Sequence, residues 1–218
     1  MNNIIGIAVS FVFVFFIIGL SMILTKNGIL KGESSRKFVH IGVSNWWIIA
    51  MIFFDSPIYA AIVPGCFVII NYISYKKSIF KVMEGERSKK DLGTVYFAVS
   101  LLILALITFS RGSHPYVGAL GILIMGYGDG FAAVFGTRYS RYSFKIWNST
   151  KTLSGSLAMF VFSFLISFVV LKTYSPGSYL LPSFALALSA TIIEMFSPLG
   201  LDNLSVPLLT AWIYTILV

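Results

Sequence analysis

The stretch Ile4–Leu24, IIGIAVSFVFVFFIIGLSMIL, decides the fold class of this chain. It contains no charged residue, and about 20 apolar residues in a row are enough for a helix to cross the hydrocarbon core of a bilayer. A cleaved signal peptide would carry positive charge before its apolar run, whereas here Lys26 and Lys31 follow the run. We therefore expect an uncleaved anchor whose N-terminus lies outside the membrane.

Further apolar runs follow along the whole chain. They lie at Phe38–Phe54, Ile58–Ile73, Val95–Phe109, Val117–Phe135, Leu153–Leu171, Tyr179–Phe196 and Leu204–Val218. The pattern predicts an all-α fold, a polytopic transmembrane bundle of about seven or eight helices. The last run is short, so we expect a tilted or re-entrant segment there.

The composition is that of a membrane protein. Of the 218 residues, 57% are hydrophobic and only 11% are charged, too few charges to cover the surface of a water-soluble domain. The length suits one integral membrane domain over residues 1–218. The net charge of +8 follows from the preference for basic residues on the cytoplasmic side, so no nucleic acid is expected as a partner.

Basic residues alternate between the loops. The loops after the first, third and fifth runs are strongly basic, whereas those between them hold at most one basic residue each. The basic loops carry Lys26, Lys31, Arg36 and Lys37, then Lys76, Lys77, Lys81, Arg87, Lys89 and Lys90, then Arg138, Arg141, Lys145 and Lys151. These loops are expected in the cytoplasm. All the acidic residues except Asp55 then fall near that same edge, which predicts a cell-membrane protein with a cytoplasmic active face.

One carboxylate interrupts an apolar run, in Gly126-Tyr127-Gly128-Asp129-Gly130. Charges inside a membrane are costly and need a reason. Gly126 and Gly130 are four positions apart, so they share a helix face and permit close backbone approach. Asp129 in such a crevice suits Mg²⁺ and substrate phosphates. The alternative is a glycine packing motif whose aspartate pairs with a basic residue.

A hydroxyl-rich turn, Ser149-Thr150-Lys151-Thr152-Leu153-Ser154-Gly155-Ser156, opens a later helix. Free N–H groups at a helix N-terminus suit a phosphate, and Lys151 adds a positive charge. The alternative is a capped helix with an ordinary cytoplasmic lysine.

Two carboxylates, Glu194 and Asp202, flank a Pro/Gly break between the last two runs. Broken helices in membranes usually line a cavity, because the freed backbone groups need partners. Glu194, Asp202 and Asn203 offer the oxygen ligands that Mg²⁺ prefers. The alternative is that Asp202 and Asn203 only cap the last helix.

The second run begins with a polar stripe, in which Glu33 and Lys37, and likewise Arg36 and His40, are four positions apart. The stripe suits an anionic group. The alternative for Arg36 and Lys37 is a role as interfacial anchors whose charged ends reach the water. His40 points one turn into an apolar helix and needs a partner.

These motifs, in this order, resemble those of the CTP-dependent lipid-alcohol kinases, which include phytol kinases, dolichol kinases and CTP-using diacylglycerol kinases. The matching elements are Glu33-x-x-Arg36-Lys37-x-x-His40, Gly128-Asp129-Gly130 with Gly136-Thr137-Arg138-Tyr139, Lys151-Thr152-Leu153-Ser154-Gly155-Ser156, and Glu194 with Asp202-Asn203-Leu204. The resemblance implies an enzyme that uses Mg²⁺ and transfers the γ-phosphate of CTP to the hydroxyl of a membrane-embedded lipid alcohol.

A distant relation to phosphatidate cytidylyltransferases, which make a CDP-lipid, is also implied. Their C-terminal His-Gly-Gly and Asp-Arg-x-Asp signature is missing, since no histidine follows His114. Several family members carry Glu where this chain has Ser154, and the small residue resembles the phytol-kinase branch. This favours a prenyl alcohol, of the phytol, farnesol, geranylgeraniol, polyprenol or dolichol type, over a diacylglycerol.

The resemblance and the residue chemistry together assign roles. Asp129 and Asp202 would bind Mg²⁺, with Glu194 and Asn203 nearby. Lys151 with Thr150 and Thr152 would hold phosphates beside Gly128 and Gly130, and Arg36 and Lys37 would offset phosphate charge. The group that activates the alcohol would be Glu33, Asp129 or His40. A transporter is disfavoured, because the sequence has no internal repeat. Assembly into a homo-oligomer is left open.

Overall fold

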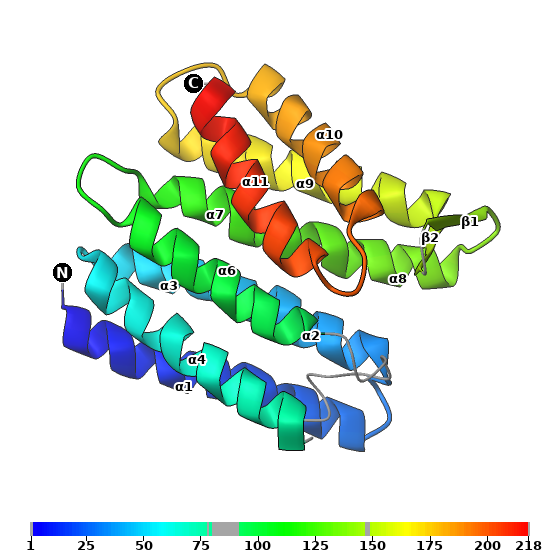
Figure 1. Cartoon of the computed structure of the whole chain (residues 1–218), viewed down its shortest axis with the longest axis horizontal. Coiled ribbons are helices and arrows are strands. Elements are labelled where there is room, and N and C mark those ends of the chain that lie inside the picture. Colours follow the sequence, from blue (N-terminus) through cyan, green and yellow to red (C-terminus); the bar gives the residue numbers. More distant parts are fainter. Residues whose placement is uncertain (1, 78, 80–91, 147–148, 218) are drawn as a thin grey trace.

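The computed structural model describes residues 2–77, 79, 92–146 and 149–217 (Figure 1). The predicted all-α bundle is confirmed. Its helices are α1 (Asn3–Lys26), α2 (Glu33–Ser44), α3 (Trp46–Phe53), α4 (Pro57–Lys77), α6 (Gly93–Thr108), α7 (Pro115–Leu123), the π-helical turn η1 (Ile124–Asp129), α8 (Gly130–Arg138), α9 (Leu153–Tyr174), α10 (Leu180–Phe196) and α11 (Asp202–Leu217). The predicted loop cations Lys81, Arg87, Lys89 and Lys90 lie outside the described residues.

Four helical rods in the described part of the chain are long and apolar enough to cross a membrane: α1, α4, the continuous rod α7–η1–α8, and α9. The apolar helices α6 and α10 are shorter. Outward-facing side chains are strongly apolar, with Val12 71%, Ile58 70% and Leu181 75% exposed. Such a surface suits lipid and would be unfavourable in water. The predicted external N-terminus stays a prediction.

Two predicted runs depart from a regular α-helix in the structure. The run Phe38–Phe54 breaks at Asn45, between α2 and α3, where the Asn45 amide donates to the Ile41 carbonyl at 2.8 Å. Asparagine competes in this way with the helical hydrogen bonds of the backbone. The run Val117–Phe135 stays continuous but widens into the π-turn η1, a feature that is frequent at functional sites.

A short antiparallel hairpin, β1 (Ser143–Ile146) and β2 (Ser149–Thr152), precedes α9. The sequence predicted a hydroxyl-rich turn before an apolar run that begins at Leu153, and that start is confirmed, but the strands were not predicted. Four-residue strands are too short to give a clear alternating pattern. Helix α9 begins at Leu153, and its N-cap is Thr152, whose Oγ1 accepts a hydrogen bond from the Gly155 N–H at 3.1 Å.

The helices run roughly along one direction, so their ends gather at two opposite ends of the bundle (Figure 1). The start of α2, the ends of α8 and α10, the hairpin, and the starts of α9 and α11 meet at the same end. Large side chains such as Trp46, Trp47 and Leu120 fill the interior between the rods. The predicted polar motifs, far apart in sequence, are thereby brought to one end.

Candidate active site

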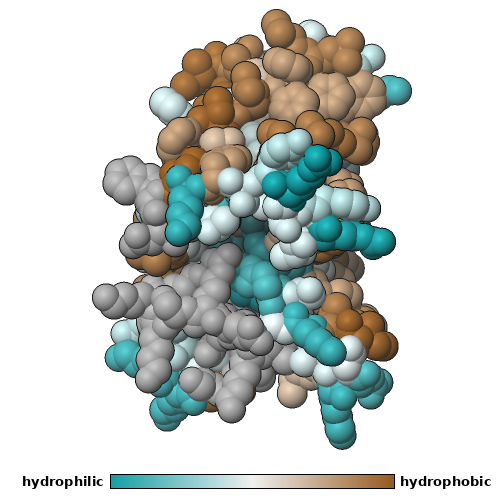
Figure 2. Space-filling model, turned by 90° about the vertical axis from the view of Figure 1, so that its right-hand side faces the viewer, coloured by the Kyte–Doolittle hydropathy of each residue, from teal (hydrophilic) through white to brown (hydrophobic). Residues whose placement is uncertain are grey.

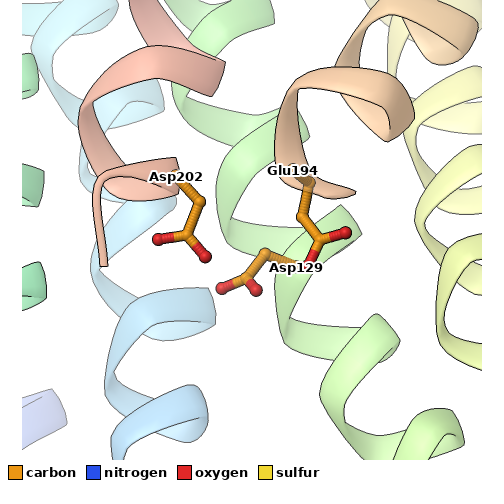
Figure 3. Close-up of side chains that lie close together, drawn as sticks. All are labelled: Asp129, Glu194 and Asp202. Atoms are coloured by element: carbon orange, nitrogen blue, oxygen red, sulfur yellow. The ribbon is translucent and has the colours of Figure 1, made fainter. Parts of the chain in front are cut away.

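Three carboxylates from three elements converge at this end (Figure 3). Asp129 ends η1, Glu194 lies near the end of α10, and Asp202 begins α11. All three residues are buried, and one carboxylate oxygen from each lies within 4.8 Å of the others. Like charges this close repel one another strongly away from water, so the cluster needs compensating cations.

The break between α10 and α11 places Asp202 opposite Glu194. Leu199 has a φ of 52° and Gly200 a φ of 79°, the left-handed conformation that reverses the chain and that glycine adopts at little cost. Asn203 then fixes the Asp202 carboxylate, because its amide donates to Asp202 Oδ1 at 2.8 Å and its backbone N–H donates to the same oxygen at 2.9 Å. The predicted helix break thus turns the chain, and Asn203 holds the Asp202 carboxylate in place after the turn.

Two lysines supply the compensating charge. Lys37 of α2 forms an ion pair with Asp129, and Lys151 of β2 forms one with Glu194. Lys151 Nζ also donates to the Glu194 backbone carbonyl at 3.0 Å. Lys37 Nζ also lies 3.8 Å from a carboxylate oxygen of Glu33. Lys37 therefore lies between two carboxylates, those of Asp129 and Glu33. Buried charges are tolerated when they are paired in this manner.

These residues line a cleft of about 410 Å³. Figure 2 shows the end of the bundle, where hydrophilic side chains gather around a recess at the centre of the face. The predicted site residues that the structure brings together in the cleft are Glu33, Lys37, Asp129, Thr150, Lys151, Thr152, Glu194 and Asp202. The volume is that of a small-molecule site, and the lining is charged and hydroxylated instead of mainly apolar.

Other predicted residues lie outside the cleft lining. Arg36 is 1% exposed and packs behind it, where its Nε donates to a Glu33 carboxylate oxygen at 3.2 Å. His40 stacks on Phe97, with ring centroids 4.7 Å apart, and lines a separate apolar cavity between α1, α2, α4 and α6. Asn203 is fully buried and acts on the cleft through Asp202.

The glycines around Asp129 pack helices together. A Cβ on Gly128 would lie 2.7 Å from the Met159 sulfur of α9, and one on Gly130 would lie 2.5 Å from Ile41 Cγ1 of α2. Both distances are too short for a side chain. The alternative interpretation, a glycine motif for helix packing, therefore accounts for these glycines. Asp129 also pairs with a basic residue, as that alternative expects.

Ser156 is a cleft residue that the sequence motifs contained but did not single out. It lines the cleft one turn after Thr152, and its buried hydroxyl has no hydrogen-bond partner among the described residues. The sequence could have indicated Ser156, because it lies four positions after Thr152 and positions four apart on a helix share a face. A buried hydroxyl without a partner is suited to hydrogen-bond a ligand in the cleft.

The carboxylate cluster fits a hard divalent cation. Mg²⁺ takes oxygen ligands at about 2.0–2.1 Å, so two oxygens on one ion lie no more than about 4.2 Å apart. One oxygen from each of the three carboxylates lies within 4.8 Å of the others, which is close to that range. Asn203 Oδ1, next to Asp202, is buried and has no hydrogen-bond partner in the described part of the chain. Asp129, Glu194 and Asp202 are therefore suited to hold Mg²⁺.

Comparison with known proteins agrees with the resemblance seen in the sequence. The chain is 33% identical over 202 residues to the phytol kinase of Synechocystis sp., covering 87% of this chain and 83% of that protein. It is 34% identical over 209 residues to probable phytol kinase 1 of Glycine max, covering 86% and 68% of the two chains. It is 31% identical over 209 residues to phytol kinase 1 of Arabidopsis thaliana, covering 86% and 67%. No family profile and no solved structure matches the chain. The chain belongs to the phytol kinase family, whose members are phosphotransferases with a lipid-alcohol acceptor.

Proposed function

We propose that this chain is a membrane lipid kinase that transfers the γ-phosphate of CTP to the hydroxyl of a prenyl alcohol, with phytol as the first candidate. The relatives that carry the name phytol kinase support the acceptor class. The observation that carries the proposal is the single cleft in which three carboxylates and two lysines meet. Phosphoryl transfer needs mainly positioning and charge neutralisation, and this set of side chains is suited to both.

The two lysines are the proposed phosphate ligands. Lys37 and Lys151 pair with Asp129 and Glu194 in the structure, and both line the cleft. A polyphosphate entering the cleft offers the same kind of anionic oxygen, so each ammonium group turns from a carboxylate to a phosphate. The Ser156 hydroxyl and the Thr152 side chain lie along the same wall and add hydrogen-bonding groups.

The carboxylates released in this exchange would hold Mg²⁺. Asp129, Glu194 and Asp202 form the donor set, and Asn203 keeps Asp202 in place. Bound Mg²⁺ would neutralise charge on the phosphate oxygens as the γ-phosphoryl group leaves the nucleotide.

Glu33 is the proposed group that orients and deprotonates the alcohol. Its side chain lines the cleft and is 33% exposed, so a substrate can reach it. Arg36 donates to the Glu33 carboxylate and fixes its orientation. Asp129 belongs to the proposed Mg²⁺ donor set and His40 lines another cavity, so neither is the proposed base.

The cleft is proposed to face the cytoplasm of a cell-membrane protein. The ends of α1 and α8 and the hairpin, which carry Lys26, Arg138 and Lys145 of the basic loops, lie at the same end of the bundle as the cleft (Figure 1). The basic side of a membrane protein normally faces the cytoplasm, where nucleotides are available.

A product assay with purified protein tests this function. The protein would be incubated with Mg²⁺ and γ-labelled CTP or ATP, against phytol, farnesol, a longer polyprenol and diacylglycerol. Label in a prenyl monophosphate together with release of CDP is the expected result. With phosphatidate added as a further acceptor, pyrophosphate release with a CDP-lipid would instead indicate a cytidylyltransferase. With diacylglycerol, label in phosphatidate would indicate a diacylglycerol kinase.

A further inference from the structure

A second pocket, of about 610 Å³, lies where α8 meets the hairpin and α9. Two arginines line it, and each stacks on the following tyrosine: Arg138 Cζ lies 5.8 Å from the Tyr139 ring centroid, and Arg141 Cζ lies 5.5 Å from that of Tyr142. All four side chains are exposed. Neither arginine forms an ion pair with a carboxylate among the described residues. The pocket therefore offers two guanidinium groups that no carboxylate in the described part of the chain neutralises.

This pocket adjoins the cleft that holds the three carboxylates and the two lysines, because Ser140 lines both. The hairpin edge between them is tied to α8 and α9 by backbone groups. Ser154 Oγ donates to the Tyr139 carbonyl at 2.7 Å, and the Leu153 N–H donates to the Tyr142 carbonyl at 3.0 Å. A group that leaves the cleft past Ser140 therefore meets the arginine pocket next.

The pocket also opens onto the apolar surface of α9. Leu153 and Leu157 line it and are 58% and 61% exposed. Val161, Leu165 and Val169 continue at the same four-residue spacing and are also exposed, so the five side chains form one ridge. At 1.5 Å per residue the ridge is about 24 Å long, which is long enough for an extended lipid tail.

We propose that this arginine pocket binds the phosphorylated prenyl lipid after transfer, with its phosphate on Arg138 and Arg141 and its tail along the ridge. The inference rests on the proposed kinase function. The product differs from the neutral acceptor by a phosphate that is excluded from the bilayer core. Guanidinium groups bind phosphate through paired hydrogen bonds, whereas an alcohol gains little from them. The pocket thus selects product over acceptor and helps to empty the cleft.

The test measures binding of labelled phytyl monophosphate to the full chain in phosphatidylcholine nanodiscs without nucleotide. The double variant Arg138→Gln/Arg141→Gln should bind at least about tenfold more weakly, since hydrogen bonds to charged groups are worth about 1.5–3 kcal/mol. Its constant for product inhibition should rise equally, while the initial rate with CTP and phytol stays unchanged. Lys145→Gln, on the same hairpin, and Arg111→Gln, in the loop before α7, are matched controls that should bind as the unaltered chain does.

Two results would overturn the inference. One is unchanged phytyl phosphate binding by the double variant. The other is displacement of phytyl phosphate by an equal amount of phosphatidylglycerol, which would make the pocket a general surface for anionic headgroups. Failure of the proposed function is separate: a chain that turns over no CTP yet binds phytyl phosphate through the arginines disproves the kinase and retains the pocket.

Discussion

Lys37 and Asp129 form a buried ion pair between α2 and η1, although 92 positions separate them in the chain. Their side chains are 3% and 6% exposed. Two charges are stable at such a depth because each compensates the other. The pair ties the first polar motif of the sequence to the second, and it holds a carboxylate beside two others.

Replacement of Lys37 by methionine should destabilise the protein. The change leaves Asp129 buried without its partner, which typically costs about 3–5 kcal/mol. The measurement is thermal unfolding in detergent with EDTA present. The double variant Lys37→Met/Asp129→Asn, which removes both charges, should regain most of the lost stability. Equal unfolding temperatures for the single and double variants would show that the pair contributes nothing.

Replacement of Asp129 by asparagine should abolish transfer of phosphate from labelled CTP. It removes one of three carboxylates from the proposed Mg²⁺ site and keeps the size of the side chain. The matched control is Asp55→Asn, because Asp55 lies outside the cleft, where its Oδ1 accepts a hydrogen bond from Asn3 Nδ2 at 2.8 Å. The control should keep full activity. Full activity in Asp129→Asn would remove Asp129 from the site.

Lys151 and Lys145 lie on the two strands of one hairpin and give a matched pair of variants. Lys151→Met should raise the KM for CTP by about tenfold or more, since a charged hydrogen bond to phosphate is worth about 1.5–3 kcal/mol. The KM for the alcohol should stay the same. Lys145→Met should leave both constants unchanged, because Lys145 does not line the cleft. A similar change in both variants would indicate a general charge effect.

Mg²⁺ should stabilise the folded protein when a nucleotide such as CDP is present to draw the two lysines from the carboxylates. A ligand at 100 times its dissociation constant adds about 2.7 kcal/mol to the free energy of unfolding. Titration with Mg²⁺ should therefore raise the unfolding temperature, and EDTA should reverse the rise. Glu194→Gln and Asp202→Asn should abolish the effect. An unaltered response in both variants would contradict a metal site in the carboxylate cluster.

Asn203 should act on the metal through Asp202. Asn203→Leu removes the side-chain hydrogen bond that fixes Asp202 Oδ1, and loss of such a supporting contact typically lowers metal affinity by about 10- to 100-fold. The Mg²⁺ concentration needed for half-maximal activity should rise accordingly. The maximal rate at saturating Mg²⁺ should recover, which a misfolded variant would not do.

The fold could largely be predicted from sequence, because apolar runs of membrane length leave few alternatives to helices. The break at Asn45 and the hairpin before α9 were not predicted, since each depends on local hydrogen bonds within a few residues. Length and hydropathy predict where a helix runs, but they do not show where a single side chain interrupts it.

The site could be predicted in part. Polar residues in apolar surroundings identified Asp129, Glu194 and Lys151, and the structure brings all three to one cleft. Spacing within α2 could not show whether Lys37 or His40 reaches the cleft, because this depends on which helices pack against each face of α2. Lys37 faces η1, whereas His40 faces Phe97 in another cavity.

Gly121 should tolerate no side chain, since a Cβ there would overlap the Pro207 carbonyl oxygen of α11. Backbone cannot move aside as a side chain can, so Gly121→Ala should destabilise the bundle by about 1–3 kcal/mol. Gly19→Ala in α1 is the control, because a Cβ at Gly19 has no neighbour within 4 Å. Alanine there should stabilise α1 by about 0.5–1 kcal/mol, as expected for helix propensity. Thermal unfolding of both variants checks the packing of α7 against α11, and equal stabilities would show that these helices lie further apart.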